Sequence, residues 1–284
     1  IFTIYKAMKA SDHIHLRCPG NMGLLGCIVQ ILFPKKSKTA KYAGNWDLNA
    51  KQPLSYKLQK WILSNTFLTK NMKVLVYGEW KNSSINVKPF FTATYYENEK
   101  EEIEIRDLSS TIKFLFVGSL TSGKRPLYVI QICEKLKERG VDLQLEIFGE
   151  GIMKQALENY IIQKELKDFV FIRGNKTKEE LKEVYKQSHF LVLPSKSEGW
   201  PKVVAEAMFW GCLPLATDIS CIANMLDNEK RGLILSINIE NDVDKIYDLI
   251  KKHEVYQNKI KNGLNWSRTY TLDFFETEIK KMLS

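Results

Sequence analysis

Two carboxylates eight positions apart form the most informative pair of residues in the sequence. Glu198 lies in a polar loop and Glu206 on a predicted helix, within PSKSEGWPKVVAEAM at residues 194–208. Pro201 suits the first turn of that helix, which places Glu206 about a turn and a half along it. Such carboxylates can accept hydrogen bonds from the hydroxyls of a ligand, while the unpaired amides at the helix start face an anion.

Two further side chains near the start of this helix suit a ligand, but each also has an ordinary explanation. Lys202 opposes the helix dipole by about 0.3–1 kcal/mol, which an anionic ligand would offset. The alternative is that its ammonium group extends into water. Trp200 either stacks on a sugar or covers the first turn of the helix.

A glycine-bearing loop at residues 118–125, GSLTSGKR, follows a predicted strand and precedes a predicted helix. It nearly matches the P-loop of nucleoside triphosphatases, but Arg125 stands where that motif needs a hydroxyl to hold magnesium. We therefore favour another interpretation, in which Lys124 and Arg125 bind a diphosphate without a metal. A solvated turn is the alternative.

Two glycines flank Glu150 at the end of a further predicted strand, in FGEG at residues 148–151. In an open α/β sheet, ligands bind outside the carboxyl ends of the strands, where such glycines allow close backbone approach. Taken alone, the pattern is also that of a tight turn.

The scaffold that positions these loops is predicted over residues 109–268, where apolar runs alternate with amphipathic stretches of helical length. The continuous apolar runs FLFV and FLVL favour burial on both faces, as in a doubly wound parallel α/β sheet. The predicted strands are 112–117, 143–148, 169–172, 190–193, 213–216 and 232–235. The predicted helices are 127–139, 152–163, 178–187, 201–210, 219–226, 241–253 and 272–283.

Residues 1–108 show a less regular α/β pattern. Strand-like runs occur at 13–16, 39–43 and 73–77, separated by helical stretches at 22–33 and 54–71. Three strands are few for an independent α/β domain, so we expect this first domain to lack its opening strands.

The net charge of +9 is unevenly distributed over the 284 residues. Residues 1–96 hold 14 Lys and Arg against three acids, or +11, whereas residues 97–284 hold 28 against 30, or −2. The change falls at the acidic run 97–107, which is typical of a linker or exposed turn. We therefore predict domains at 1–108 and 109–268, and a terminal helix in 269–284 that packs back on the first domain.

Composition excludes several classes of protein. The five cysteines are scattered and never spaced as C-x-x-C, which indicates reduced thiols in a cytoplasmic protein and no zinc site. The longest apolar stretch, 22–33, is shorter than the ~20 residues that a membrane-spanning helix needs.

Four lysines follow that apolar stretch, namely Lys35, Lys36, Lys38 and Lys41. The stretch and its lysines either dock on an anionic membrane surface, or pack on the sheet and lie in a solvated loop. A third possibility combines a packed helix with lipid-facing cations. No RNA-binding signature interleaves the cations, so we expect no nucleic-acid partner.

The stretch 112–235 resembles the donor-binding domain of the retaining GT-B glycosyltransferases of family four, the glycosyl transferases group 1. The resemblance rests on FVGSL with Lys124, IFGEG at 147–151, the Glu198 and Glu206 pair, and GCLPLAT at 211–217. Upstream, LRCPGN, KYAGNW and VLVYGEW resemble a subgroup of bacterial surface-polysaccharide and lipopolysaccharide assembly. The resemblance implies an α/β GT-B architecture, in which two Rossmann-like domains face a cleft.

The resemblance also implies roles for individual residues. Glu206 would hold the ribose hydroxyls of a nucleotide-sugar, Glu198 the donor sugar, and Lys124 the diphosphate. The family usually has an arginine at the position of Ser119, so Arg125 is the expected substitute. The remaining donor-side residues would be Gly118, Glu150, Arg173, Gly199, Trp200 and Lys202.

A histidine of the first domain often faces the donor sugar in this family, which makes His15 the candidate here. A histidine that only packs within its strand is the alternative. His189 is interpreted as structural. The acceptor side would include Arg17, Asn21, Asn45 and Trp46.

The implied reaction is hexosyl transfer with retention of configuration, from a nucleoside-diphosphate sugar to a glycan or lipid-linked acceptor. It needs no cofactor and no obligatory metal, and would serve surface-polysaccharide synthesis at the inner face of the plasma membrane. The alternatives are a non-catalytic module that binds nucleotide or an anionic polymer, and a P-loop-like NTPase.

Overall fold

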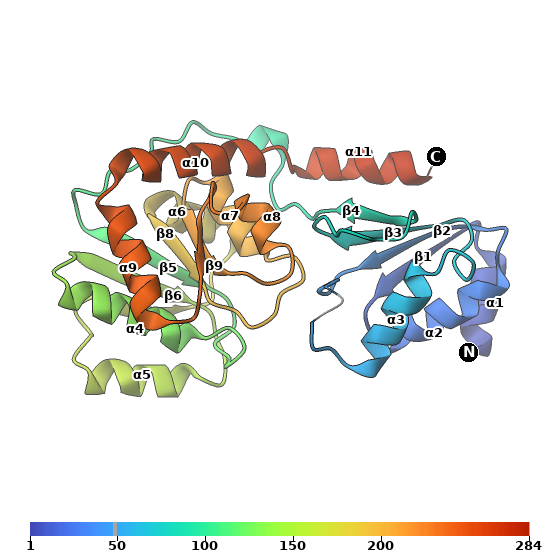
Figure 1. Cartoon of the computed structure of the whole chain (residues 1–284), viewed down its shortest axis with the longest axis horizontal. Coiled ribbons are helices and arrows are strands. Elements are labelled where there is room, and N and C mark those ends of the chain that lie inside the picture. The colour runs from blue at the N-terminus through green and yellow to red at the C-terminus, as the bar shows by residue number, and fades with distance from the viewer. Residues whose placement is uncertain (48–49, 284) are drawn as a thin grey trace. The chain divides into compact units, whose positions relative to one another are not determined.

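The computed structural model describes residues 1–47 and 50–283. Its contacts divide the chain into two units: Ile1–Phe91 with Glu198–Trp200, and Thr92–Ser197 with Pro201–Ser284. Each unit contains its own parallel sheet with helices packed on it (Figure 1). The predicted α/β class with two Rossmann-like sheets is therefore confirmed.

The first unit has the strand order β1-β2-β3-β4, and all neighbouring strands are parallel. The strands are β1 (His13–Cys18), β2 (Ser37–Tyr42), β3 (Met72–Tyr77) and β4 (Val87–Phe90). The helices are α1 (Phe2–Ala10), α2 (Asn21–Val29), the short η1 (Gln30–Leu32) and α3 (Leu54–Ser64). The sequence predicted β1 to β3 and the two central helices, but neither α1 nor β4.

Helix α2 lies very close to β1 because two of its residues lack a side chain. A Cβ atom at Gly26 would come within 2.8 Å of Leu16 Cδ2, and one at Gly23 within 2.8 Å of the Arg17 carbonyl oxygen. The predicted apolar stretch therefore packs on the sheet. Part of it still faces solvent, through Met22, Ile28 and Leu32.

Two of the clustered lysines belong to the folded framework instead of a solvated loop. The Lys36 ammonium donates to carbonyl oxygens at the end of α1, including that of Met8 at 2.8 Å. Lys38 is 1% exposed and donates to Gln30 Oε1 at 2.8 Å. Burial lowers the pKa of Lys38 to about 8.

The second unit has a six-stranded parallel sheet in the order β10-β9-β8-β5-β6-β7. Its strands are β5 (Ile112–Val117), β6 (Leu143–Phe148), β7 (Val170–Gly174), β8 (Phe190–Leu193), β9 (Leu213–Thr217) and β10 (Leu233–Leu235). All six predicted strands are present. The chain runs outward from β5 in one direction and from β8 in the other, so the loops after these two strands meet at the switch point of the sheet.

The helices of the second unit cover its sheet and extend the chain beyond it. They are η2 (Glu97–Glu99), α4 (Pro126–Glu138), α5 (Lys154–Gln163), α6 (Lys178–Gln187), α7 (Lys202–Phe209), α8 (Ile222–Leu226), α9 (Ile239–Ile250), α10 (His253–Ser267) and α11 (Leu272–Leu283). Helix α10 was not predicted. Its buried stripe is narrow and half of it is not strongly apolar: Tyr256, Ile260, Gly263 and Ser267. A Cβ atom at Gly263 would contact Met208 of α7. Helix α11 groups with the second unit, and its predicted packing on the first domain stays a prediction.

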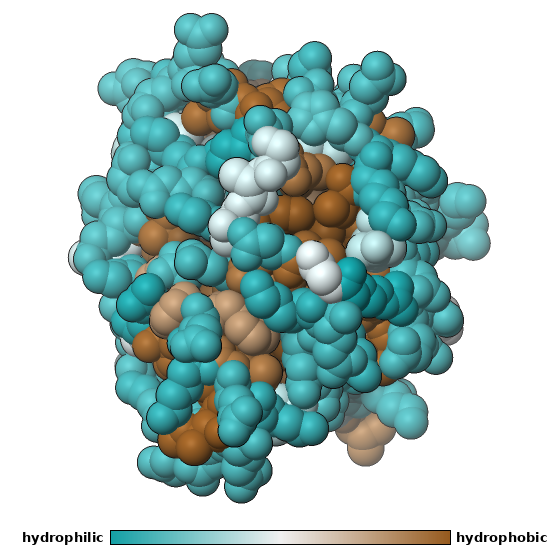
Figure 2. All heavy atoms as spheres, turned by 90° about the vertical axis from the view of Figure 1, so that its left-hand side faces the viewer, coloured by the Kyte–Doolittle hydropathy of each residue, from teal (hydrophilic) through white to brown (hydrophobic). Residues whose placement is uncertain are grey.

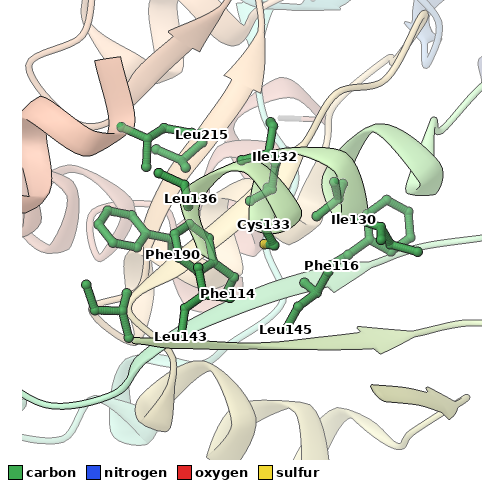
Figure 3. Packing of buried hydrophobic residues seen from close by; sticks show 14 of the residues in the cluster. Phe114, Phe116, Ile130, Ile132, Cys133, Leu136, Leu143, Leu145, Phe190 and Leu215 are labelled. Atoms are coloured by element: carbon green, nitrogen blue, oxygen red, sulfur yellow. The ribbon is translucent and has the colours of Figure 1, made fainter. Parts of the chain in front are cut away.

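The core of the second unit lies between β5, β6, β8, β9 and helix α4. Figure 3 shows Phe114 and Phe190 from neighbouring strands beside Cys133 and Leu136 of α4. The rings of Phe114 and Phe190 stack with centroids 5.1 Å apart. Strands β5 and β8 are buried on both faces, as their continuous apolar runs predicted.

The acidic run at 97–107 is bound to the second unit, so the contacts divide the chain at Phe91 and Thr92 instead of at 108 and 109. Glu99 pairs with Lys178, and Glu101 with Lys182 and Lys186, all on α6. The composition of this run suggested a solvated linker. Its lysine partners lie about 80 residues further along the chain, so the local sequence does not reveal them.

The exposed apolar side chains are concentrated in the first unit. The face of the second unit in Figure 2 is mostly hydrophilic, with scattered apolar patches. In the first unit the exposed large apolar residues are Ile1, Phe2, Met22, Ile28, Leu32, Leu54, Leu58, Trp61, Phe67 and Ile85.

Candidate functional site

Glu206 lies on α7 and is held by hydroxyl groups on both of its carboxylate oxygens. Thr94 Oγ1 donates to Glu206 Oε1 at 2.8 Å, and the Tyr185 hydroxyl donates to Oε2 at 3.1 Å. Tyr185 is completely buried, and burial with the adjacent Glu206 charge raises its pKa well above the usual value. The tyrosine therefore stays protonated and acts as a donor. Neither partner was predicted from the sequence, because they lie 112 and 21 residues away from Glu206.

The loop before α7 carries the other predicted carboxylate, Glu198. By its contacts, Glu198–Trp200 groups with the first unit, whereas α7 belongs to the second. A Cβ atom at Gly199 would lie 2.2 Å from the carbonyl oxygen of Ala43, so only glycine fits there. The Trp200 ring lies 5.6 Å from the ring of Tyr77. Both predicted roles of Trp200, stacking on a sugar and covering the first turn of α7, stay predictions.

The structure brings the two glycine loops together at the carboxyl ends of β5 and β6. The Gly118 amide donates to the Phe148 carbonyl at 3.0 Å, and the Leu120 amide to the Glu150 carbonyl at 2.9 Å. A Cβ atom at Gly149 would lie 1.9 Å from the Gly118 carbonyl oxygen. The loops therefore touch backbone to backbone, and Ser119 between them is exposed.

Two predicted nucleoside-side residues are engaged with their neighbours. Glu150 is exposed and pairs with Lys154 at 2.9 Å. Arg173 donates to Glu146 at 2.9 Å, and its guanidinium lies 4.7 Å from the centre of the Phe171 ring. In this arrangement Arg173 contacts its own strand and β6.

The two cations of the first glycine loop differ in their surroundings. Lys124 is half-buried. Arg125 caps α4 with a left-handed φ of +52° and donates to the Pro194 carbonyl at 3.1 Å. It lines a pocket of about 310 Å³ with the loops after β8, β9 and β10: Ser195, Lys196, Thr217, Asp218, Ile219, Leu235, Ser236 and Ile237. That Arg125 takes over the role of the arginine that the family has at the position of Ser119 stays a prediction.

Lys202 is exposed in the first turn of α7, which contains no acidic residue. Pro201 caps the helix and does not form its first residue. The amide end of the helix dipole and the Lys202 ammonium present positive potential, as an anion site requires.

The predicted residues of the first unit fall into two groups. His15 and His13 both contact Thr39 Oγ1, at 2.8 and 2.9 Å, and partial burial followed by the charge of His13 lowers the pKa of His15. Arg17 lies further along the same exposed edge of β1, and Asn21 is exposed at the start of α2.

The other two acceptor-side candidates stabilise the first unit itself. Trp46 is 3% exposed and packs edge-on against Tyr42, with ring centroids 5.0 Å apart. Asn45 Oδ1 accepts from the Asp47 amide at 2.9 Å, which closes a turn. Trp46 is thus part of the core, and the predicted contact of either residue with an acceptor stays a prediction.

His189 occupies a structural position, in line with its interpretation. The Lys113 amide donates to its Nδ1 at 3.0 Å, which leaves Nε2 to donate to the Asp107 carbonyl at 2.9 Å. Burial, then the nearby charge of Arg106, lowers its pKa to about 4.

Within residues 1–47 and 50–283, no group of three or more His, Cys, Asp or Glu side chains is placed to hold a metal ion. Over the same residues, every helix is too short or too polar to cross a membrane. Metal independence and the absence of a nucleic-acid partner stay predictions.

The two parallel sheets, each with helices packed on it, have the architecture of the GT-B fold. The crystal structure of Anabaena Alr3699/HepE in complex with UDP matches 99% of this chain and 81% of that one, with a TM-score of 0.79 and 10% identity. The chain belongs to the family of glycosyl transferases group 1, whose model matches residues 97–266.

Curated relatives agree with the family. Amylovoran biosynthesis glycosyltransferase AmsK of Erwinia amylovora is 29% identical over 48% of this chain and 35% of its own length. UDP-Gal:alpha-D-GlcNAc-diphosphoundecaprenol alpha-1,3-galactosyltransferase of Escherichia coli is 27% identical over 64% of this chain and 49% of its own length. The match therefore spans less than half of either relative.

Proposed function

We propose that the chain is part of a glycosyltransferase that moves a sugar from a nucleoside-diphosphate sugar to a glycan or lipid-linked acceptor in surface-polysaccharide synthesis. The main supporting observation is the pair of joined glycine loops at the edge of the second sheet, in a chain of the glycosyl transferases group 1 family. The names of the two relatives, one in amylovoran synthesis and one acting on a diphosphoundecaprenol-linked sugar, support this acceptor class.

In the proposed reaction, the departing nucleoside diphosphate develops negative charge as the glycosidic bond breaks. Lys124 and the amides of the first turn of α7 would stabilise that charge, a role that a metal ion fills elsewhere. Glu206 would hold the ribose hydroxyls, and Glu198 the donor sugar. With retention of configuration, the acceptor attacks on the face that the leaving group vacates, and the leaving phosphate takes the acceptor proton.

The acceptor side is proposed to include His15, Arg17 and Asn21. They line the exposed edge of β1 and the start of α2, in a segment of high positive charge. That charge suits an anionic glycan or lipid diphosphate. A P-loop NTPase is disfavoured, because Arg125 bonds to a carbonyl and offers no hydroxyl for magnesium.

The proposal predicts that UDP or GDP stabilises the protein without magnesium. At 100 times Kd, a nucleotide adds about 2.7 kcal/mol to the free energy of unfolding, a shift of several degrees in Tm. Glu206→Ala should remove most of this shift. Thermal unfolding in EDTA with each nucleotide measures it. If neither nucleotide nor any nucleotide-sugar shifts the Tm of the intact protein, the proposed function is wrong.

We also propose peripheral attachment to the cytoplasmic face of a membrane. The exposed Met22, Ile28 and Leu32 support it, in a unit with strong positive charge. Because Lys36 and Lys38 are bound within the fold, other lysines, such as the exposed Lys35, would meet the lipid headgroups.

A further inference from the structure

The carboxylate of Glu206 offers about four lone-pair positions, and protein hydroxyls occupy two of them. Thr94 takes a position on Oε1 and Tyr185 a position on Oε2. One position remains on each oxygen. Two neighbouring acceptor positions match the two vicinal hydroxyls of a ribose ring.

The protein encloses the Thr94 side of this carboxylate. A cavity of about 10 Å³ lies there between residues 92–95, α7 and the end of α10. It has room for one water molecule at most and none for a sugar ring. A ribose can therefore reach Glu206 only through the lone pairs that the two hydroxyls leave free.

The two donors come from different elements and act in the same direction. Tyr185 is completely buried on α6, so its hydroxyl position is fixed by packing. Thr94 lies in the segment after Phe91. The residue that follows it, Tyr95, packs against Phe209 and Trp210, with ring centroids 4.9 and 5.0 Å away. Both hydroxyls are thus held in place by contacts other than those with Glu206. Each hydrogen bond restricts the rotation of the Glu206 carboxylate.

We infer that Thr94 and Tyr185 are positioning residues that orient Glu206 to accept hydrogen bonds from the ribose of the donor nucleotide. The inference rests on the proposed function. Both hydroxyls bind Glu206, so each would act on affinity through that carboxylate. Through Thr94, nucleotide affinity would also depend on the conformation of the segment after Phe91.

The test measures the Kd of UDP and of GDP by calorimetry on the full chain. Thr94→Val and Tyr185→Phe each remove one hydroxyl with little change in volume, and each should weaken binding about tenfold, as for a lost hydrogen bond to a charged group. Thr94→Ser restores the hydroxyl and should restore affinity. With a nucleotide-sugar that supports turnover, KM should rise while kcat changes little.

Two control variants remove a tyrosine and a threonine hydroxyl that bind carboxylates other than Glu206. Tyr160→Phe breaks a tyrosine hydrogen bond to Glu134, and Thr111→Val breaks a threonine bond to Asp142. Neither should change the Kd. Thr94→Val is also introduced beside Glu206→Ala, where it should have no further effect because its partner is gone.

Three results would overturn the inference. Wild-type affinity in both Thr94→Val and Tyr185→Phe would show that the hydroxyls do not orient the site. An equal loss in the Glu206→Ala background would show that Thr94 acts by another route. If the wild-type protein binds no nucleotide, the proposed function fails and the inference fails with it, whereas failure of the inference alone leaves wild-type binding intact.

Discussion

At the scale of residues, two polar side chains buried in the second unit, His189 and Tyr185, are bound by partners that fix their protonation. His189 is 4% exposed and bridges β5 and the segment before it through both ring nitrogens. Its neutral form is required because Nδ1 accepts a hydrogen bond. Tyr185 is the opposite case, a buried group that must be protonated. Its raised pKa means that the hydroxyl retains its proton and donates it in a hydrogen bond to Glu206.

His189 predicts a pH dependence of stability. Its pKa falls from 6.5 in the unfolded chain to about 4 in the folded one, so the unfolded state binds the extra proton between these values. The stabilisation is complete above about pH 6.5 and declines as the pH falls toward 4, by at most about 3 kcal/mol. Urea unfolding from pH 7.5 to 4.5 measures it. His189→Gln should flatten the profile, and the exposed His253→Gln should not; equal slopes in both variants would refute this origin.

At the scale of elements, the two glycine loops and α7 lie at the ends of strands that the sequence predicted well. Strands β5 and β8 are continuous apolar runs, which predicts their burial on both faces, whereas β6 alternates polar and apolar residues. The contacts of the loops were not predictable in detail. That Gly118 and Gly149 touch depends on the pairing of β5 with β6, which a linear pattern does not contain.

The close approach of these loops predicts that Gly149→Ala is costly. The added Cβ atom would lie 1.9 Å from the Gly118 carbonyl, at a φ of +148° that disfavours alanine. We expect a loss of about 1–3 kcal/mol in unfolding free energy and weaker nucleotide binding. Gly123→Ala in the same region meets only Thr121 at 3.9 Å and should be neutral. Similar denaturation midpoints for the two variants would contradict the strain at Gly149.

At the scale of the whole molecule, charge and exposed apolar surface both concentrate in the first unit. Sequence alone showed the charge, because it only needs counting. It did not show which lysines face solvent, since the buried position of Lys38 depends on the packing of Gln30. The predicted boundary at residues 108 and 109 differs from the division at Phe91 and Thr92 for a similar reason. The acidic run pairs with lysines far along the chain.

This distribution predicts binding to anionic liposomes through the first unit. Affinity should rise with the fraction of anionic lipid, by about 1 kcal/mol for each lysine near the surface. Met22→Asp with Leu32→Asp should release the protein, whereas Ile152→Asp, at an even more exposed apolar residue of the second unit, should not. Co-sedimentation that is indifferent to anionic lipid would count against membrane attachment.

Two of the contacts that attach the residues after Phe91 to the second unit differ in their response to ionic strength. Near its start, Tyr95 is held by aromatic packing, which salt scarcely weakens. Further on, Glu99 and Glu101 are held by surface lysines, whose attraction is screened over about 8 Å at physiological salt. Rising ionic strength therefore weakens the pairing of Glu99 and Glu101 with α6, whereas the packing of Tyr95, the neighbour of Thr94, is retained.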